Sequence, residues 1–196
     1  MRTLPNDSLV FFREFLRKPT SIGAVTPSSP HLAKEIVRGL NLRDSDLVLE
    51  YGPGTGSFTR RILSDKGSAT RFVVLEINSD FALRLRQAHP TLELYECSVE
   101  RAPALLEELE LPLADVVVSG LPWASFDSKL QAKLLHATRC ALRPGGRFVT
   151  FAYAHGILLP SAHQFRERLH RTFSRVRYSR IVWGNLPPAF VYRCIR

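Results

Sequence analysis

Three glycines at alternate positions, Gly52, Gly54 and Gly56, follow an apolar run that begins at Leu47. Only glycine lets the backbone turn there and approach a ligand without a Cβ in the way. A phosphate-binding P-loop needs a Lys-Ser/Thr pair after its last glycine, and a dinucleotide fingerprint needs a third glycine at position 57, which is Ser57. The spacing therefore disfavours both a P-loop enzyme and a nicotinamide enzyme.

Two acidic residues accompany these glycines. Glu50 lies two positions before Gly52, and Glu76 ends the next apolar run, twenty residues past Gly56. A carboxylate in the position of Glu76 can accept hydrogen bonds from both hydroxyls of a ribose. The combination resembles the pattern of class I S-adenosylmethionine-dependent methyltransferases. We therefore expect Glu50, the three glycines and Glu76 to bind S-adenosyl-L-methionine, with S-adenosyl-L-homocysteine as the product.

A second motif, Ser119-Gly120-Leu121-Pro122-Trp123, ends a later apolar run. In a fold of this class the loop after the fourth strand faces the methyl donor, so we expect residues 119–122 to bind the donor and the acceptor nitrogen to lie beside Trp123. A cationic substrate or product could rest on the indole ring through cation–π attraction. The alternative is a tryptophan buried beneath the loop.

The elements that must position these residues alternate from Asp46 onward between short apolar runs and helical patterns, which is typical of parallel strands with crossover helices. The expected strands are Leu47–Tyr51, Arg71–Glu76, Leu92–Glu96, Asp115–Ser119 and Arg147–Phe151. The expected helices are 58–63, 79–88, 104–110, 128–142 and 162–172. Between the fourth helix and the fifth strand, Pro144-Gly145-Gly146 predicts a turn.

Two further apolar runs, 176–183 and 190–195, are joined by Gly184-Asn185-Leu186-Pro187-Pro188, which predicts an antiparallel hairpin at the edge of the sheet. We therefore predict an α/β fold: a Rossmann-like methyltransferase with a seven-stranded, mostly parallel sheet and an antiparallel edge hairpin. Residues 1–32 are expected to form an N-terminal amphipathic helix and a segment that covers the donor site, and residues 33–196 the methyltransferase domain.

The N-terminal segment 9–16 is rich in aromatic residues, and on a helix its apolar side chains would cover an arc of about 160°. Arg13, Glu14, Arg17 and Lys18 fall on the opposite side. This arrangement suits a helix that lies in a membrane interface, since apolar burial and attraction to anionic headgroups then add. The alternative, a helix packed on the domain's own core, is the commoner use of such a pattern.

Composition sets the broad class. A chain of 196 residues is expected to form one domain, and its formal net charge of +9 suits a polyanionic partner, either a nucleic acid or an anionic membrane. No apolar run is long enough to span a membrane, and no signal peptide is evident. Three cysteines without a CxxC pair, and histidines without HxxxH spacing, argue against a disulfide framework and a metal site. We expect a cytoplasmic protein.

From Phe11 to its end, the chain resembles the bacterial phospholipid N-methyltransferases, which methylate phosphatidylethanolamine toward phosphatidylcholine. The matching segments are 22–29, 50–56, 119–122, Tyr153 and 185–189. The resemblance implies that residues 9–16 bind an anionic membrane, so that the protein would lie at the inner face of the cell membrane and act there on a phospholipid substrate. The family tends to carry Gly-Asp after the third strand, where the aspartate meets the adenine amino group; here Cys97-Ser98 stands there, and Ser98 takes that position.

The implied chemistry is an in-line attack of an amine nitrogen on the sulfonium methyl group. The leaving thioether needs no acid, so catalysis would depend on alignment and desolvation. The amine must first lose a proton, for which Tyr153 and His155 are the candidates. Tyr192 and Arg193 are candidates to hold a lipid phosphate.

Three alternatives remain. The chain could be an RNA adenine N6-methyltransferase, because Gly120-Leu121-Pro122-Trp123 resembles the Asn-Leu-Pro-Tyr motif of those enzymes. Against this, Gly120 lacks a side-chain amide to grip the adenine, and no appended RNA-binding domain is evident. A methyltransferase for a small soluble amine is a further possibility. The last is a membrane-surface module that binds the donor without catalysis, for which the intact glycines and Glu76 would have no purpose beyond regulation.

Overall fold

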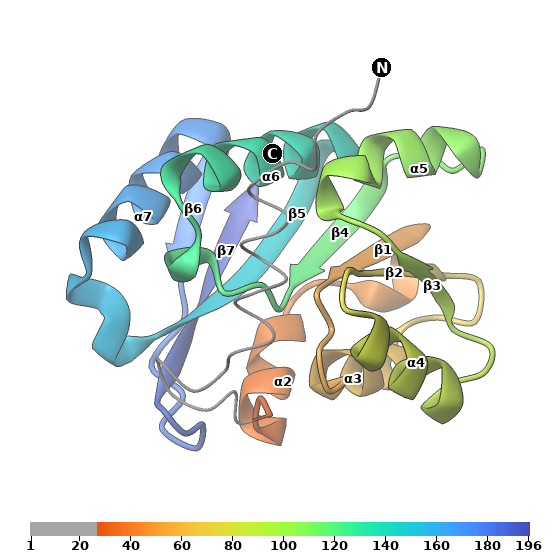
Figure 1. Cartoon of the computed structure of the whole chain (residues 1–196), viewed down its shortest axis with the longest axis horizontal. Helices are drawn as coiled ribbons and strands as arrows, with labels where there is room; N and C mark the ends of the chain where they lie inside the picture. The colour runs from red at the N-terminus through yellow and green to blue at the C-terminus, as the bar shows by residue number, and fades with distance from the viewer. Residues whose placement is uncertain (1–26) are drawn as a thin grey trace.

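The computed structural model describes residues 27–196, so the predicted helix at 9–16 and most of the 22–29 motif lie outside the described residues. A single seven-stranded sheet crosses the molecule in the order β3-β2-β1-β4-β5-β7-β6, with helices on both of its faces (Figure 1). Among residues 27–196, no helix has the length and apolar character needed to cross a membrane.

The first five strands are parallel, and β7 runs antiparallel to both β5 and β6. Their bounds are β1 Leu47–Tyr51, β2 Arg71–Glu76, β3 Glu93–Glu96, β4 Ala114–Ser119, β5 Leu142–Tyr153, β6 Arg175–Tyr178 and β7 Ala189–Ile195. The predicted Rossmann-like fold, with its mostly parallel sheet and antiparallel edge, is confirmed.

The helices are α2 Pro30–Val37, α3 Ser57–Asp65, α4 Ser79–Ala88, α5 Ala102–Glu108, α6 Ser128–Ala141 and α7 Pro160–Thr172, with short 3-10 turns η1 Leu42–Asp44, η2 Val99–Arg101, η3 Trp123–Ser125 and η4 Ala154–Leu158. Side-chain caps fix several of the starts. The Asn78 side chain accepts from two backbone amides at the start of α4, and the Asp127 side chain accepts from Leu130 N at the start of α6. The expected boundary at residue 32 falls within α2.

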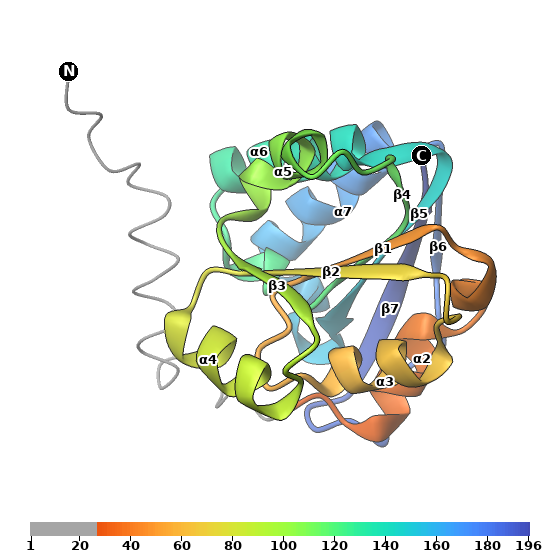
Figure 2. The same cartoon turned by 90° about the vertical axis from the view of Figure 1, so that its right-hand side faces the viewer.

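Each face of the sheet has its own hydrophobic core. Figure 2 shows α5, α6 and α7 on one face and α2, α3 and α4 on the other. All five residues of β1 are buried, with Leu49 in the first core and Val48 in the second. A parallel strand that is covered on both faces consists mainly of apolar residues, and β1 could be predicted from the sequence for that reason.

Two predicted boundaries were wrong. The Pro144-Gly145-Gly146 segment does not separate α6 from a later strand, because β5 already begins at Leu142, and the segment forms an irregularity inside it between the pairs Ala114–Leu142 and Val116–Arg147. The β6 strand ends at Tyr178 rather than near residue 183, since beyond it only a single bridge, Val182 with Ala189, joins this segment to β7.

Candidate active site

The carboxyl ends of β1, β2, β3 and β4 border a pocket at one edge of the sheet. In the sheet, β2 and β3 lie on one side of β1, and β4 and β5 lie on the other (Figure 1). Ligands of open α/β sheets bind at such a switch point, where the connections diverge to opposite faces. The pocket is lined by Gly52, Leu75, Glu76, Ile77, Cys97, Ser98, Val99, Glu100, Leu121, Leu130 and Leu134.

The glycine loop and the 119–122 segment meet above β1 and β4. Gly52, Gly54 and Gly56 have φ of +61°, +55° and +78°, a region that side chains with a Cβ rarely adopt. The Gly120 amide donates to Tyr51 O at 2.8 Å, and a Cβ on Gly120 would lie only 2.4 Å from Gly52 O. Glycine at position 120 is therefore required for the two motifs to touch.

Glu76 lies at the end of β2 with 3% of its surface exposed, and it lines the pocket. Its carboxylate accepts from Gly54 N at 3.3 Å and from Asn78 N at 2.8 Å, so the glycine loop itself orients it. Burial raises the pKa of Glu76, although the backbone amides oppose that effect. A buried acceptor at the rim of the glycine loop fits a ligand that carries hydroxyl donors, such as a ribose.

Glu50 is completely buried beside this loop. Its Oε2 accepts from the Thr59 hydroxyl at 2.8 Å, whereas its Oε1 has no hydrogen-bond partner among the described residues. Burial raises the pKa of Glu50 to about 8. A buried carboxylate oxygen without a partner is costly unless a ligand group satisfies it, but Glu50 is not among the residues that line the pocket.

Ser98, the residue predicted at the adenine, does line the pocket, and its hydroxyl accepts from Glu100 N at 3.3 Å at the start of η2. Glu100 lines the same pocket and was missed by the sequence analysis. Lys133 donates to Glu100 Oε2 at 3.2 Å, while Oε1 is buried without a hydrogen-bond partner among the described residues. A carboxylate is therefore present in this pocket two residues after Ser98.

Trp123 is a core residue. Only 2% of its surface is exposed, its ring stacks on Phe165 with centroids 5.0 Å apart, and its indole N–H donates to the Ser119 hydroxyl at 3.0 Å. We expected the acceptor nitrogen to lie beside the Trp123 ring. The structure instead buries that ring under Phe165 of α7. The neighbouring Leu121 lines the pocket instead, and Pro122 precedes η3.

Tyr153 and His155 lie at and just beyond the carboxyl end of β5, outside the pocket lining. Their rings stack with centroids 5.7 Å apart, and the Tyr153 ring meets Phe151 edge-on. Burial raises the pKa of Tyr153, which keeps its hydroxyl protonated near neutral pH. His155 is exposed. The pair shares the edge of the sheet with the pocket and can offer one hydroxyl and one imidazole.

The two residues expected to hold a lipid phosphate have structural roles instead. Tyr192 is 2% exposed and packs against Phe165, ring edge to face. Arg193 donates to the Glu35 carboxylate at 2.9 Å and to Arg38 O at 2.8 Å, which ties β7 to α2. Alternation along β7 places these neighbours on opposite faces of the sheet. Neither the Arg193 guanidinium nor the Tyr192 phenol is part of the pocket lining.

The comparisons with known proteins point to one chemistry. The model of the ribosomal RNA adenine dimethylase family matches residues 22–99. An ornithine lipid N-methyltransferase of Singulisphaera acidiphila is 32% identical over 191 residues, which cover 96% of this chain and 95% of that protein. The chain belongs to the family of bacterial lipid N-methyltransferases. As a member of this family it is an S-adenosylmethionine-dependent methyltransferase, and the predicted enzyme class and donor are confirmed.

Two further similarities carry less weight, one because it covers a shorter stretch and the other because the sequence identity is low. A dimethyladenosine transferase of Candida glabrata is 33% identical over 121 residues, but the match covers 61% of this chain and only 36% of that protein. An O-methyltransferase of Bacillus cereus, solved in complex with SAH, superposes with a TM-score of 0.70 at 16% identity, over 98% of this chain and 93% of that one. This last likeness concerns the fold alone.

Replacing Glu76 with alanine is expected to weaken donor binding by about 2 kcal/mol, roughly thirtyfold, because the ribose would lose a charge-assisted hydrogen-bond pair. Isothermal calorimetry with the donor measures the change. The matched control is Glu93→Ala, which removes an exposed carboxylate at the other end of the neighbouring strand, where it pairs with Arg71. Equal affinities of the two folded variants would remove Glu76 from the donor site.

Proposed function

We propose that the protein transfers methyl groups from S-adenosyl-L-methionine to the primary amine of a lipid headgroup at the inner face of the cell membrane. Phosphatidylethanolamine, methylated toward phosphatidylcholine, is the first substrate to test, and ornithine lipid carries the same reacting group. The observation that carries the proposal is the match to an ornithine lipid N-methyltransferase over 96% of this chain. The RNA enzymes match over shorter stretches.

The pocket and the glycine loop beside it hold the donor together. Gly52 lines the pocket, Gly54 and Gly56 give the loop its backbone conformation, and Glu76, which also lines the pocket, binds the ribose hydroxyls. Glu50 Oε1 accepts from a cationic or N–H group, and Glu100 Oε1 receives the adenine amino group that Ser98 cannot hold as a carboxylate would. The bound donor supplies an electrophilic methyl group on a sulfonium centre.

The chain's own contribution to the reaction is alignment and the removal of water. The amine nitrogen attacks the methyl carbon in line, and the thioether leaves without an acid, so no protein group need protonate it. The ammonium headgroup must lose a proton first. His155 is the candidate base at this edge of the sheet, and Tyr153 orients its imidazole by stacking on it.

Methyl-labelled donor, offered in parallel to total bacterial lipid and to total RNA, tests the proposal. The label is expected in a chloroform-soluble product, and purified phosphatidylethanolamine and ornithine lipid then separate the two headgroups. Label that is released by ribonuclease and absent from lipid would favour the RNA adenine alternative. Donor binding without turnover on any lipid, RNA or soluble amine would favour the non-catalytic module.

A further inference from the structure

Large apolar side chains are exposed in two short segments of the chain. Of the nine large hydrophobic residues that are exposed within residues 27–196, six lie in residues 154–159 and 179–188. Leu158 is 91% exposed, Leu186 76% and Trp183 75%; the other three are Ile157, Leu159 and Ile181. Apolar groups scattered singly need no explanation, but a cluster of this kind marks a contact surface.

The two segments meet at the carboxyl edge of the sheet, where β5 ends and β7 begins. Segment 154–159 continues from the end of β5, and segment 179–188 leads into the start of β7, where Tyr153 pairs with Ala189. The Ala154 amide donates to Pro188 O at 2.8 Å. In Figure 1 the segment after β5 lies at the left and the loop before β7 at the bottom. Because β5 is parallel to β4 and β1, this is also the edge at which the donor pocket opens.

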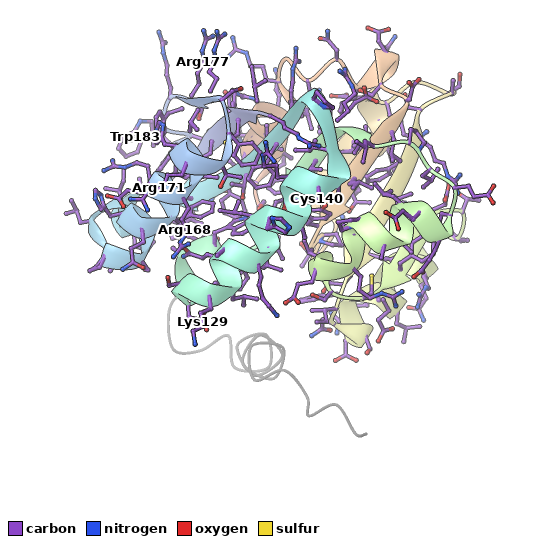
Figure 3. All side chains as sticks on the ribbon, turned by 90° about the horizontal axis from the view of Figure 1, so that it is seen from above. Lys129, Cys140, Arg168, Arg171, Arg177 and Trp183 are labelled. Atoms are coloured by element: carbon purple, nitrogen blue, oxygen red, sulfur yellow. The ribbon has the colours of Figure 1, made fainter. Side chains whose placement is uncertain are left out.

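Charge around these segments is one-sided. Neither segment contains an aspartate or a glutamate, and Arg180 is exposed within the second. Within the described part of the chain, Arg177 and Arg180 form no ion pair with an acidic residue. In the view of Figure 3, Trp183 lies on the same side of the molecule as Arg168 and Arg171 of α7, of which Arg171 pairs with Glu167 at 3.4 Å. An anionic surface would find cations here and no repelling carboxylate within the two segments.

We propose that residues 154–159 and 179–188 form a membrane-docking edge that inserts Leu158, Trp183 and Leu186 among the headgroups of an anionic lipid surface. Apolar side chains beside free arginines suit such a surface, where burial and electrostatic attraction add, and tryptophan prefers the membrane interface. RNA is bound through phosphate contacts and base stacking, for which exposed leucines have no use. The proposal rests on the proposed lipid substrate, whose amine would reach the pocket from this edge.

Tryptophan fluorescence of the full chain tests the contact directly. The chain has two tryptophans, and Trp123 is 2% exposed, so emission that aqueous acrylamide quenches comes from Trp183. On vesicles of equal parts phosphatidylglycerol and phosphatidylcholine, we expect the emission to shift to shorter wavelength, acrylamide quenching to fall, and brominated lipids to quench. If Trp183 of vesicle-bound protein stays open to acrylamide and untouched by brominated lipid, the membrane-docking edge is wrong, whatever else binds the vesicle.

A pair of matched variants tests the energetics. Leu158→Glu with Leu186→Glu is expected to lower partition onto these vesicles at least about tenfold. Leu83→Glu with Leu113→Glu makes the same change of charge at leucines outside the two segments, one on α4 and one just before β4, which are 55% and 42% exposed. This pair should change partition less than about twofold. Equal losses in the two double variants would overturn the proposal, as would protection of Trp183 by RNA without protection by vesicles.

Methyl transfer to lipid dispersed in detergent keeps this proposal separate from the proposed function. The Leu158→Glu, Leu186→Glu variant should methylate dispersed lipid as the wild type does and lose activity only on vesicles. If Trp183 inserts into vesicles but the protein methylates no lipid, either in vesicles or in detergent, the proposed function is wrong and the membrane-docking edge is still supported. Lipid methylation that the double variant retains on vesicles would defeat the docking edge alone.

Discussion

Replacing Glu50 with glutamine is expected to stabilise the protein above pH 8 and, in the same variant, to weaken donor binding. Burial raises the pKa of Glu50 from the ordinary 4.5 to about 8. Between these two values the folded protein keeps a proton that the unfolded chain releases, so the free energy of unfolding of the wild type falls as pH rises. The loss is complete above about pH 8 and is on the order of 5 kcal/mol.

Glutamine carries no such proton, and its carbonyl oxygen can still accept from the Thr59 hydroxyl. Urea unfolding at pH 5 and at pH 8.5 should give similar stabilities for the two proteins at the lower pH, and a more stable variant at the higher one. Calorimetry should show weaker donor binding by the same variant. Glu93→Gln, at a carboxylate outside the pocket lining, is the matched control for donor binding. Parallel pH profiles for wild type and Glu50→Gln would contradict the prediction.

A substitution that stabilises the fold and weakens ligand binding indicates a functional site, because residues that bind a ligand are retained there even though they lower the stability of the fold. We expect Glu50 to behave in this way. Glu100 also has an Oε1 atom that is buried without a hydrogen-bond partner among the described residues, and it lines the pocket. The sequence pointed to Glu50 through its spacing to the glycines. Glu100 carried no comparable signal, since its place in the pocket depends on η2 and on Lys133 of α6, which are brought together by tertiary packing.

The fold could be predicted where local pattern and tertiary environment agree. The β1 and β2 strands match their expected bounds, since each is a continuous apolar run bounded by polar or glycine residues. The Pro144-Gly145-Gly146 segment misled because its backbone is held by distant partners: Gly145 N donates to Arg196 O, and Arg196 N donates to Gly146 O. A turn signal in the sequence cannot reveal that the chain's last residue pairs there.

The acceptor side could be predicted less well than the donor side, for a physical reason. The sequence motif Pro122-Trp123 does not indicate whether the indole is exposed or buried. The indole is buried because Phe165 on α7 and Phe148 on β5 pack against it. The glycine loop, in contrast, depends on backbone conformations that only one residue type adopts readily, so its residues can be identified without knowledge of their neighbours.

Replacing Gly120 with alanine is expected to reduce donor affinity by at least about tenfold and to destabilise the fold by about 1–3 kcal/mol, the usual cost of forcing atoms into a packed site. The new Cβ would lie 2.4 Å from Gly52 O, and a backbone oxygen cannot rotate away as a side chain can. The two loops must separate, which displaces Gly52 and Leu121 in the lining of the pocket.

Alanine variants of two other glycines serve as controls, since they distinguish the effect of this clash from the general effect of adding a methyl group. Gly54→Ala meets no atom within 4 Å but forces alanine to φ +55°, so it measures backbone strain within the loop without a collision. Gly156→Ala has its nearest contact at 3.8 Å, to a leucine side chain, and should bind the donor as the wild type does. Calorimetry with the donor, on variants whose thermal transitions show them folded, ranks the three. If Gly120→Ala binds the donor as tightly as Gly156→Ala, contact between the two motifs is not what shapes the pocket, and the donor must be held by the glycine loop and Glu76 without support from β4.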